Sequence, residues 1–334
     1  MKKITTLTIA SMLAGVAGLH AQAFTNPSGY VTHTLKTGQF NPIGLTLHEP
    51  VTVSGAFETV SGTTLTDDDV DFDSVLTDGT TYILEITSGT LSGTIQEVVW
   101  NSPSATNNIV TSDNLGSDGL VAADTYQIRA ASTLQGVFGT PPELVSTAVA
   151  ASSDLVWVPT ASGSYDRYYY RTPVFGGTPE WTDATTGEAI GELPLVYTDG
   201  VFVQLRDTSP EIDLVVTGSV RTESVTIPAF TGFNLISNVF PVGSTVQNSG
   251  LENALVSGAT VSSSDVVWIL DVVTGQYDRY YYRTPVFGGS PGWVDAVDNS
   301  AIPDNFELPS AFFIQRVGGD TNIDIAAPAE YSNL

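Results

Sequence analysis

The stretch YDRYYYRTPVFGG occurs twice in the chain, at residues 165–177 and again at 277–289, and all thirteen letters are the same. Such a repeat constrains the fold, because two copies of one unit are expected to adopt one structure. It also raises a question of function. The duplicated unit is either an element of the fold or a binding site.

The similarity between the copies continues on both sides of this stretch. Three further pairs of segments match: SSDLVW (152–157) with SSDVVW (263–268), WTDA (181–184) with WVDA (293–296), and FVQ (202–204) with FIQ (313–315). Each unit therefore runs from a tryptophan strand through the tyrosine strand and a Gly-Gly turn to a closing strand.

The beginnings of the two units are spaced differently. FNLI (233–236) resembles FNPI (40–43), and TVQ (245–247) resembles TLQ (133–135). Asn234 precedes Thr245 by 11 residues, whereas Asn41 precedes Thr133 by 92, and the excess of 81 is close to one small domain. A surface loop tolerates such an insertion, because lengthening a loop costs little free energy. The alternative makes residues 24–130 a separate N-terminal domain.

The composition of the segments predicts an all-β protein. Strand-like runs rich in β-branched and aromatic residues alternate with Gly, Asn, Asp, Ser and Pro: TYILEIT (81–87), TYQIRA (125–130), DLVWV (154–158), VFVQLR (201–206), IDLVVTG (212–218) and AFFIQRV (311–317). No run of ten residues has a helical period with caps. We expect two tandem β-sandwich or barrel-like modules, the first interrupted by a small barrel-like β-domain. The predicted boundaries are 24–54 plus 131–221 for the first module, 55–130 for the inserted domain and 222–334 for the second module.

The N-terminal residues 1–23 have the pattern of a secretory signal peptide, with Lys2 and Lys3, an apolar run and the small-x-small site Ala21-Gln22-Ala23. We therefore expect a secreted, periplasmic or cell-surface protein, without a transmembrane helix. The chain has no cysteine, which excludes disulfides and thiolate metal sites. Without the two leading lysines, 9 basic residues face 36 acidic ones, a net charge of −27, and this disfavours nucleic acid as a partner.

Alternate residues of the repeated strand are expected to face opposite sides of a sheet. One face takes Tyr165, Arg167, Tyr169 and Arg171, and the other takes Asp166, Tyr168 and Tyr170. We expect Trp157 and Trp268, which lie inside apolar strands, to be core residues, and the Gly-Gly pairs to form turns.

Trp181 and Trp293 follow a Gly-Gly-x-Pro turn and are expected in loops, where binding residues concentrate. Indoles on a surface stack on sugar rings, and nearby carboxylates accept hydrogen bonds from the sugar hydroxyl groups. The candidate ligand-binding residues are Trp181, Trp293, Tyr168, Tyr280, Arg171, Arg283, Asp183 and Asp295. The alternative is a purely structural role, in which the indoles pack in the core.

The acidic run TDDDVDFDSVLTD (66–78) is a candidate calcium site. In an extended chain, alternate carboxylates line one side: Asp67, Asp69, Asp71 and Asp73. Phe72 stands where an EF-hand loop needs glycine, so the site is not of that type. The alternative is a solvated acidic loop with no cofactor.

Catalytic signals are few. After the signal segment the chain has two histidines, His33 and His48, and no nucleophile-elbow, zincin, phosphate-loop or dinucleotide-binding pattern occurs in a suitable context. Among 36 acidic residues the sequence does not single out a catalytic pair. We therefore expect no enzymatic activity.

The order of FN-x-I, SSD-x-VW and YDRYYYR segments resembles secreted bacterial modules with the pattern WNLVG…W-x-YD…GYWV. The pieces YILEITSGTLSG (82–93) and ADTYQIRAASTLQGVFG (123–139) resemble the other part of an uncharacterised family of exported bacterial β-repeat proteins. The resemblance implies export and this architecture, and no catalytic residues. Some members end in an apolar sorting signal, whereas this sequence ends AAPAEYSNL, so retention by that route is not expected.

These features predict an exported, non-enzymatic protein with a structural, adhesive or binding role at the cell exterior. The alternative is a carbohydrate-binding or glycan-degrading accessory protein that uses the duplicated aromatic residues. The expected partners are an extracellular polysaccharide or a component of the cell envelope.

Overall fold

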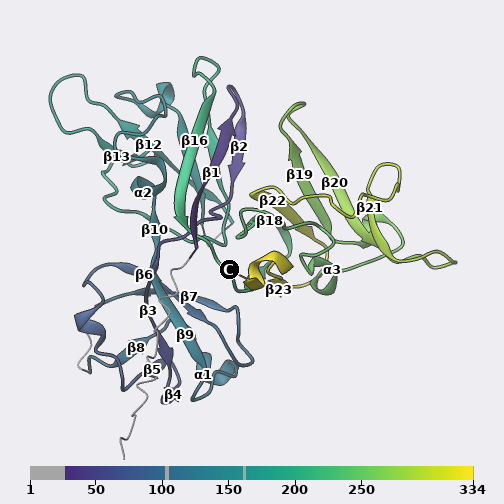
Figure 1. Cartoon of the computed structure of the whole chain (residues 1–334). Coiled ribbons are helices and arrows are strands. Elements are labelled where there is room, and N and C mark those ends of the chain that lie inside the picture. Colours follow the sequence, from purple (N-terminus) through teal and green to yellow (C-terminus); the bar gives the residue numbers. More distant parts are fainter. Residues whose placement is uncertain (1–26, 102–104, 161–162, 334) are drawn as a thin grey trace, which may run out of the picture.

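The computed structural model describes residues 27–101, 105–160 and 163–333, so the predicted signal peptide lies outside the described residues. The all-β class is confirmed, since nearly all regular structure is antiparallel strand (Figure 1). The helices of the described residues have three to five residues each: α1 (Leu115–Asp118), α2 (Leu134–Phe138), α3 (Leu251–Ala254), and the 3-10 turns η1 (Phe72–Ser74), η2 (Ala150–Ser152), η3 (Val261–Ser263) and η4 (Ala329–Asn333). None of them has the length and apolar character needed to cross a bilayer.

Two five-stranded sheets contain the repeated segments. The first has the order β13-β12-β11-β15-β2, formed by β2 (Phe40–Ile43), β11 (Leu155–Pro159), β12 (Tyr165–Arg171), β13 (Glu180–Asp183) and β15 (Val201–Gln204). The second has the order β21-β20-β19-β22-β18, formed by β18 (Gly232–Ser237), β19 (Val266–Asp271), β20 (Gln276–Arg283), β21 (Gly292–Asp295) and β22 (Ala311–Arg316). The two orders correspond strand for strand.

The registers of the two sheets correspond as well. Trp157 lies between Arg167 and Phe202 on the neighbouring strands, and Trp268 lies between Arg279 and Phe313. The repeated letters therefore specify one sheet twice. We call these two sheets, with their connections, the first and second modules.

The first module takes its edge strand from a distant part of the chain. β2 pairs with β15, with Asn41 opposite Val203. The Asn41 side chain also donates a hydrogen bond of 3.0 Å to the Val203 carbonyl. Residues on both sides of a long intervening segment thus share one sheet.

That intervening segment forms two sheets of its own, which we call the middle domain (Figure 1). Their orders are β3-β9-β6-β7 and β4-β5-β8, with β3 (Val51–Ala56), β4 (Thr59–Ser61), β5 (Thr64–Thr66), β6 (Thr81–Ile86), β7 (Ile95–Val99), β8 (Asn108–Val110) and β9 (Thr125–Ala130). A separate core fills the domain, with Phe57, Phe72, Trp100 and Tyr126 among its buried rings. β3 begins at Val51, within the segment predicted for the first module, because its alternating pattern does not indicate which sheet it joins.

Three two-stranded ribbons complete the architecture: β1 (Ser28–Leu35) with β16 (Ile212–Ser219), β17 (Val225–Ala229) with β23 (Thr321–Ile325), and β10 (Ser132–Thr133) with β14 (Pro194–Leu195). Of the two forms that we expected, sandwich-like or barrel-like, the described ranges contain no closed barrel, and the sheets have two to five strands each. One continuous core of buried residues instead joins the two modules.

A buried ionic cluster lies where the middle domain meets the first module. Glu85 of β6 is fully buried and accepts hydrogen bonds from four side chains: Arg221 Nη1 (2.6 Å), Tyr197 Oη (2.5 Å), Arg129 Nη2 (3.1 Å) and Gln127 Nε2. Burial by itself raises the pKa of Glu85, but the charges of Arg221 and Arg129 outweigh burial and hold its pKa below the usual value. The carboxylate is therefore ionised and satisfied.

The cluster joins segments that are far apart in the sequence. Arg221 lies in the connection to the second module, where its guanidinium also donates to the carbonyl oxygens of Glu223 (2.8 Å) and Ser224 (2.9 Å). The ring of the buried His48 packs on Tyr197, with ring centroids 4.4 Å apart. Burial, together with the nearby charges of Arg129 and Arg221, lowers the pKa of His48 to about 3.

The depressed pKa of His48 predicts an acid-sensitive stability. The imidazole is protonated below pH 6.5 in the unfolded chain, but only near pH 3 in the folded protein. The free energy of unfolding therefore decreases as the pH is lowered from about 6.5 to about 3. One such group contributes about 1.4 kcal/mol per pH unit. In the His48→Phe variant, urea unfolding at pH 7, 6 and 5 should show a shallower loss of stability than in the wild type.

The described residues contain a second histidine, His33, whose pKa burial lowers to about 4. It contributes a similar slope to both proteins and therefore leaves the difference between them intact. Equal slopes for the wild type and the His48→Phe variant would contradict the buried, uncharged state of His48.

Candidate functional site

The two tryptophans predicted in binding loops are core residues. Trp181 lies on β13 and Trp293 on β21, and their side chains are 3% and 5% exposed. Each packs edge-on against the tyrosine opposite it on the next strand, at 5.8 Å from Tyr170 and 5.6 Å from Tyr282. The prediction of loop indoles is wrong, because the strand resumes immediately after the Gly-Gly-x-Pro turn.

The other predicted ligand-binding residues have structural roles as well. Tyr168 and Tyr280 are buried in the same core as the two indoles. Arg171 pairs with Glu180 across the sheet at 3.2 Å, and Arg283 lies partly buried opposite Gly292. The carboxylates of Asp183 and Asp295 each accept two backbone N–H groups of the following turn. The eight residues do not form an exposed aromatic groove.

Trp157 and Trp268, which we expected in the core, are only partly buried and lie on the opposite face of their sheets. The guanidinium carbon of Arg167 lies 5.4 Å from the centre of the Trp157 ring, and Arg279 lies 5.3 Å from that of Trp268. Each indole N–H donates to a glutamine of the neighbouring strand at 3.2 Å. The positions of the two tryptophan pairs are therefore the reverse of the prediction, since an apolar strand does not reveal which of its faces is covered.

The exchange of roles predicts unequal costs of substitution. Trp181→Ala should lower the free energy of unfolding by about 3–5 kcal/mol, since it empties a core position and removes the hydrogen bond from Trp181 Nε1 to the Gly139 carbonyl. Trp157→Ala removes a partly exposed ring, its cation–π contact with Arg167 and its hydrogen bond to the Gln204 side chain, and should cost only about 1–2 kcal/mol because no buried cavity is left. Urea titrations of both variants measure the difference, and equal costs would contradict the assignment of faces.

The acidic run does not line up its carboxylates. The chain turns after Asp67 and enters η1, because the Phe72 ring is drawn fully into the core of the middle domain. Asp67 is buried and accepts hydrogen bonds from Tyr126 Oη (2.6 Å) and the Asp69 N–H (2.9 Å), whereas Asp69, Asp71 and Asp73 are exposed. The row of four predicted for an extended chain is therefore wrong.

A further carboxylate, that of Glu58 between β3 and β4, lies close to the start of the acidic run. Oxygen atoms of Glu58, Asp67 and Asp69 lie within 4.8 Å of one another. Hydrogen bonds within the protein already account for this arrangement, since Glu58 also accepts the Asp68 N–H at 2.8 Å. Calcium binding stays a prediction.

The repeated stretch ends in a largely exposed loop of six residues. After β12 and β20 the chain leaves each sheet in the loops TPVFGG (172–177) and TPVFGG (284–289). Phe175 is 97% exposed and Phe287 is 96% exposed, and the valine before each is exposed as well. We call these two hexapeptides the Val-Phe loops.

The Val-Phe loops have a defined shape. Both glycines of each loop have positive φ, with values of +67° and +104° in the first and +65° and +90° in the second, which other residues rarely adopt. A Cβ placed on Gly177 would lie 3.3 Å from the Pro173 ring, and one on Gly289 would lie 3.5 Å from the Pro285 ring. Proline and the glycine pair therefore fix the turn and hold each phenylalanine in solvent.

Packing explains only part of the thirteen-residue identity. The three central tyrosines of the first copy are buried, so their identity follows from the shared sheet. Val174 and Phe175 are largely exposed, so burial does not explain why both recur unchanged. Directly after the loops the copies diverge, from TPEW (178–181) to SPGW (290–293). The sequence had shown the repeat, and only burial shows which part of it faces solvent.

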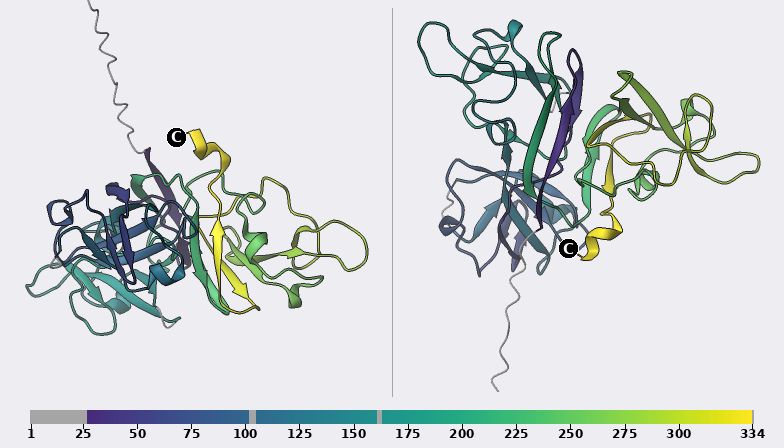
Figure 2. Two further views of the ribbon diagram at one scale, coloured as in Figure 1. Left: turned by 90° about the horizontal axis from the view of Figure 1, so that it is seen from below. Right: turned by 45° about the horizontal axis from the view of Figure 1, so that its top comes forward.

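The two loops point away from different parts of the molecule. β12 and β13 lie on one side and β20 and β21 on the other, in Figure 1 and in both views of Figure 2. One small partner site therefore does not contact both loops at once.

A comparison of the chain with protein-family models found no match, and comparisons with curated proteins and with solved structures found none either. The resemblance to exported bacterial β-repeat proteins stays a prediction.

Proposed function

We propose that the protein is an exported, non-enzymatic adhesive protein that bridges two partner sites through its Val-Phe loops. The observation that carries this proposal is the nearly complete exposure of Phe175 and Phe287 at the same position of two otherwise divergent modules. Covering an exposed apolar ring with a partner removes it from water, and this contributes favourably to the free energy of binding.

The energetics favour a bivalent mode of attachment. Burial of one phenylalanine side chain is worth about 1.5–3 kcal/mol, which supports only weak binding at a single loop. Two loops on one rigid protein raise the overall affinity for a surface with many sites by about 10²–10⁴. Because the turns are already fixed, little conformational entropy is lost on binding.

The charge of the chain limits the partner. A formal net charge of −25 repels anionic lipid, nucleic acid and other copies of the same chain. A positively charged protein surface with apolar recesses suits both the loops and this charge. The carbohydrate-binding alternative is not supported by Trp181 and Trp293, since neither ring is available for stacking.

The test uses isolated cell envelopes of the producing organism. We expect the purified wild-type protein to bind the envelope fragments and to cross-link them, which raises the turbidity of the suspension. Phe175→Ser and Phe287→Ser should each bind through the remaining loop but fail to cross-link. The double variant should do neither.

The matched control is Val273→Ser, which removes a side chain that is 88% exposed in the β19–β20 turn, outside both loops. It should bind and cross-link like the wild type. Cross-linking by either single phenylalanine variant would refute bridging. Unchanged binding to protease-treated envelopes would refute a protein partner.

A further inference from the structure

The two modules contact each other with approximate two-fold symmetry. Phe202 of β15 and its counterpart Phe313 of β22 meet at the centre, with ring centroids 5.7 Å apart. On one side the Thr198 carbonyl accepts the Ser237 N–H at 3.0 Å. On the other side Ser310, the counterpart of Asp199, lies against Gly44, whose N–H is 3.4 Å from Ser310 Oγ.

The symmetry is broken at the turns that lead into β2 and β18. Asn41 Oδ1 accepts the N–H of Lys36, five residues earlier, and Asn234 Oδ1 accepts that of Phe230, only four residues earlier. The first turn therefore contains an additional residue, Gln39.

Gln39 covers one side of the contact between the modules. The symmetry-related side has no such residue and stays open. A Cβ placed on Gly275 of the second module would lie 3.6 Å from Gln39 Nε2. The matching Gly163 has no such neighbour within 4 Å.

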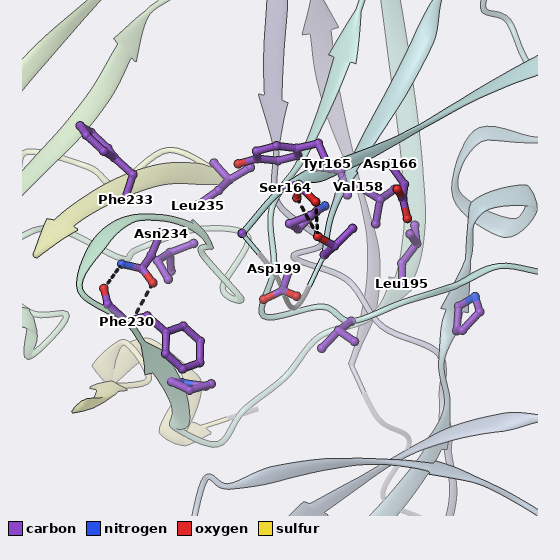
Figure 3. Close-up of a pocket in the computed structure, with 18 of the residues that line it drawn as sticks. Val158, Ser164, Tyr165, Asp166, Leu195, Asp199, Phe230, Phe233, Asn234 and Leu235 are labelled. Carbon is purple, nitrogen blue, oxygen red and sulfur yellow. Dashed lines mark hydrogen bonds between the residues drawn. The ribbon is translucent and has the colours of Figure 1, made fainter. Parts of the chain in front are cut away.

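The open side is a cleft of about 780 Å³ to which all three parts of the chain contribute (Figure 3). The first module supplies side chains of β11 and β12, among them Val158 and Tyr165, and the segment before β15. The second module supplies the β17–β18 turn, and the middle domain supplies Glu97 of β7. This volume lies within the range of small-molecule sites.

The walls of the cleft combine carboxylates with aromatic rings. Asp166, Asp199 and Glu97 line it, and none of its described lining residues is basic. Tyr165 and Phe230 flank Asp199 from opposite walls (Figure 3). The Asp199 carboxylate accepts no hydrogen bond from the described residues, although its backbone N–H donates to the Val196 carbonyl at 3.1 Å.

The carboxylate of Asp199 has no cationic partner among the described residues. The residue is exposed to the cleft, and the neighbouring protein that displaces part of its water, and secondarily the charge of Glu97, raise its pKa to about 6. A positive charge placed beside it would relieve both effects. The field of a chain with net charge −25 also concentrates cations at the cleft mouth.

We propose that this cleft binds a small organic cation, with its ammonium group beside Asp199 and Glu97 and its apolar part against the rings of Tyr165 and Phe230. Aromatic faces attract cations, so the rings and the carboxylates favour the same ligand. This site is independent of the Val-Phe loops and does not depend on the adhesive role.

The probe is benzylamine, titrated into the full chain by calorimetry at pH 7.5, with benzyl alcohol as the uncharged comparison. We expect benzylamine to bind at least about tenfold more tightly than benzyl alcohol. Asp199→Ser, which installs the residue found at the matching position of the second module, should weaken benzylamine by about tenfold or more. Asp278→Ser is the matched control, because Asp278 is the counterpart of Asp166 and lies outside the cleft.

The affinity for benzylamine should rise between pH 5 and pH 7 as Asp199 ionises, and Asp199→Ser should remove this rise. The other titratable groups that face the cleft are Glu97 of β7 and, on β12, Tyr165, Asp166 and Tyr168. Phe230→Ala, at an exposed position, should weaken both probes and tests the aromatic wall separately. Equal affinities for the two probes, or equal effects of Asp199→Ser and Asp278→Ser, would overturn the proposal.

Discussion

The ionised Glu85 is the interaction on which the arrangement of the three parts depends. Moving a carboxylate out of water costs several kcal/mol, and the cost is offset only when the partners have good geometry. Here the partners come from different places: Arg129 from the middle domain, Tyr197 from the first module and Arg221 from the connection to the second module. The cost of burying the Glu85 carboxylate is therefore offset only when the middle domain is docked against the first module and the connection that carries Arg221.

The Glu85 cluster attaches the middle domain to the first module, and one shared core joins the two repeated modules. The same register in both modules places tyrosines and two tryptophans in a shared core and Trp–Arg pairs on the other face. The Gly-Gly turns then present the Val-Phe loops at separated positions. The cleft lies on the side of the contact that lacks the additional turn residue, and it carries aspartate at position 199 where the matching position 310 has serine.

The sequence predicted what repetition and period determine. Two matching units and the β-rich segments were readable, because side-chain alternation and turn residues act locally. The tryptophan faces were not readable, since alternation separates two faces without showing which one a neighbour covers. The acidic run was assigned an extended form because the pull of the Phe72 ring into the core is a tertiary effect.

The ionic cluster left no local signal at all. Its members are dispersed from His48 to Arg221, and each sits in a segment that resembles ordinary strand or loop. The cleft is equally hidden, since Asp199 is one of 36 acidic residues until the fold brings Glu97 and Phe230 beside it. Sites formed between distant segments are visible only in three dimensions.

Native-state hydrogen exchange of the Arg221→Met variant tests most directly whether the Glu85 cluster joins the parts. Mass spectrometry resolves peptides from β6 in the middle domain and from β11 in the first module. We expect both to exchange in the wild type through one shared opening, and we expect the variant to lower the opening free energy of both by about 3–5 kcal/mol. A variant that affects neither peptide, or that affects only one of them, would contradict this account of how the chain is held together.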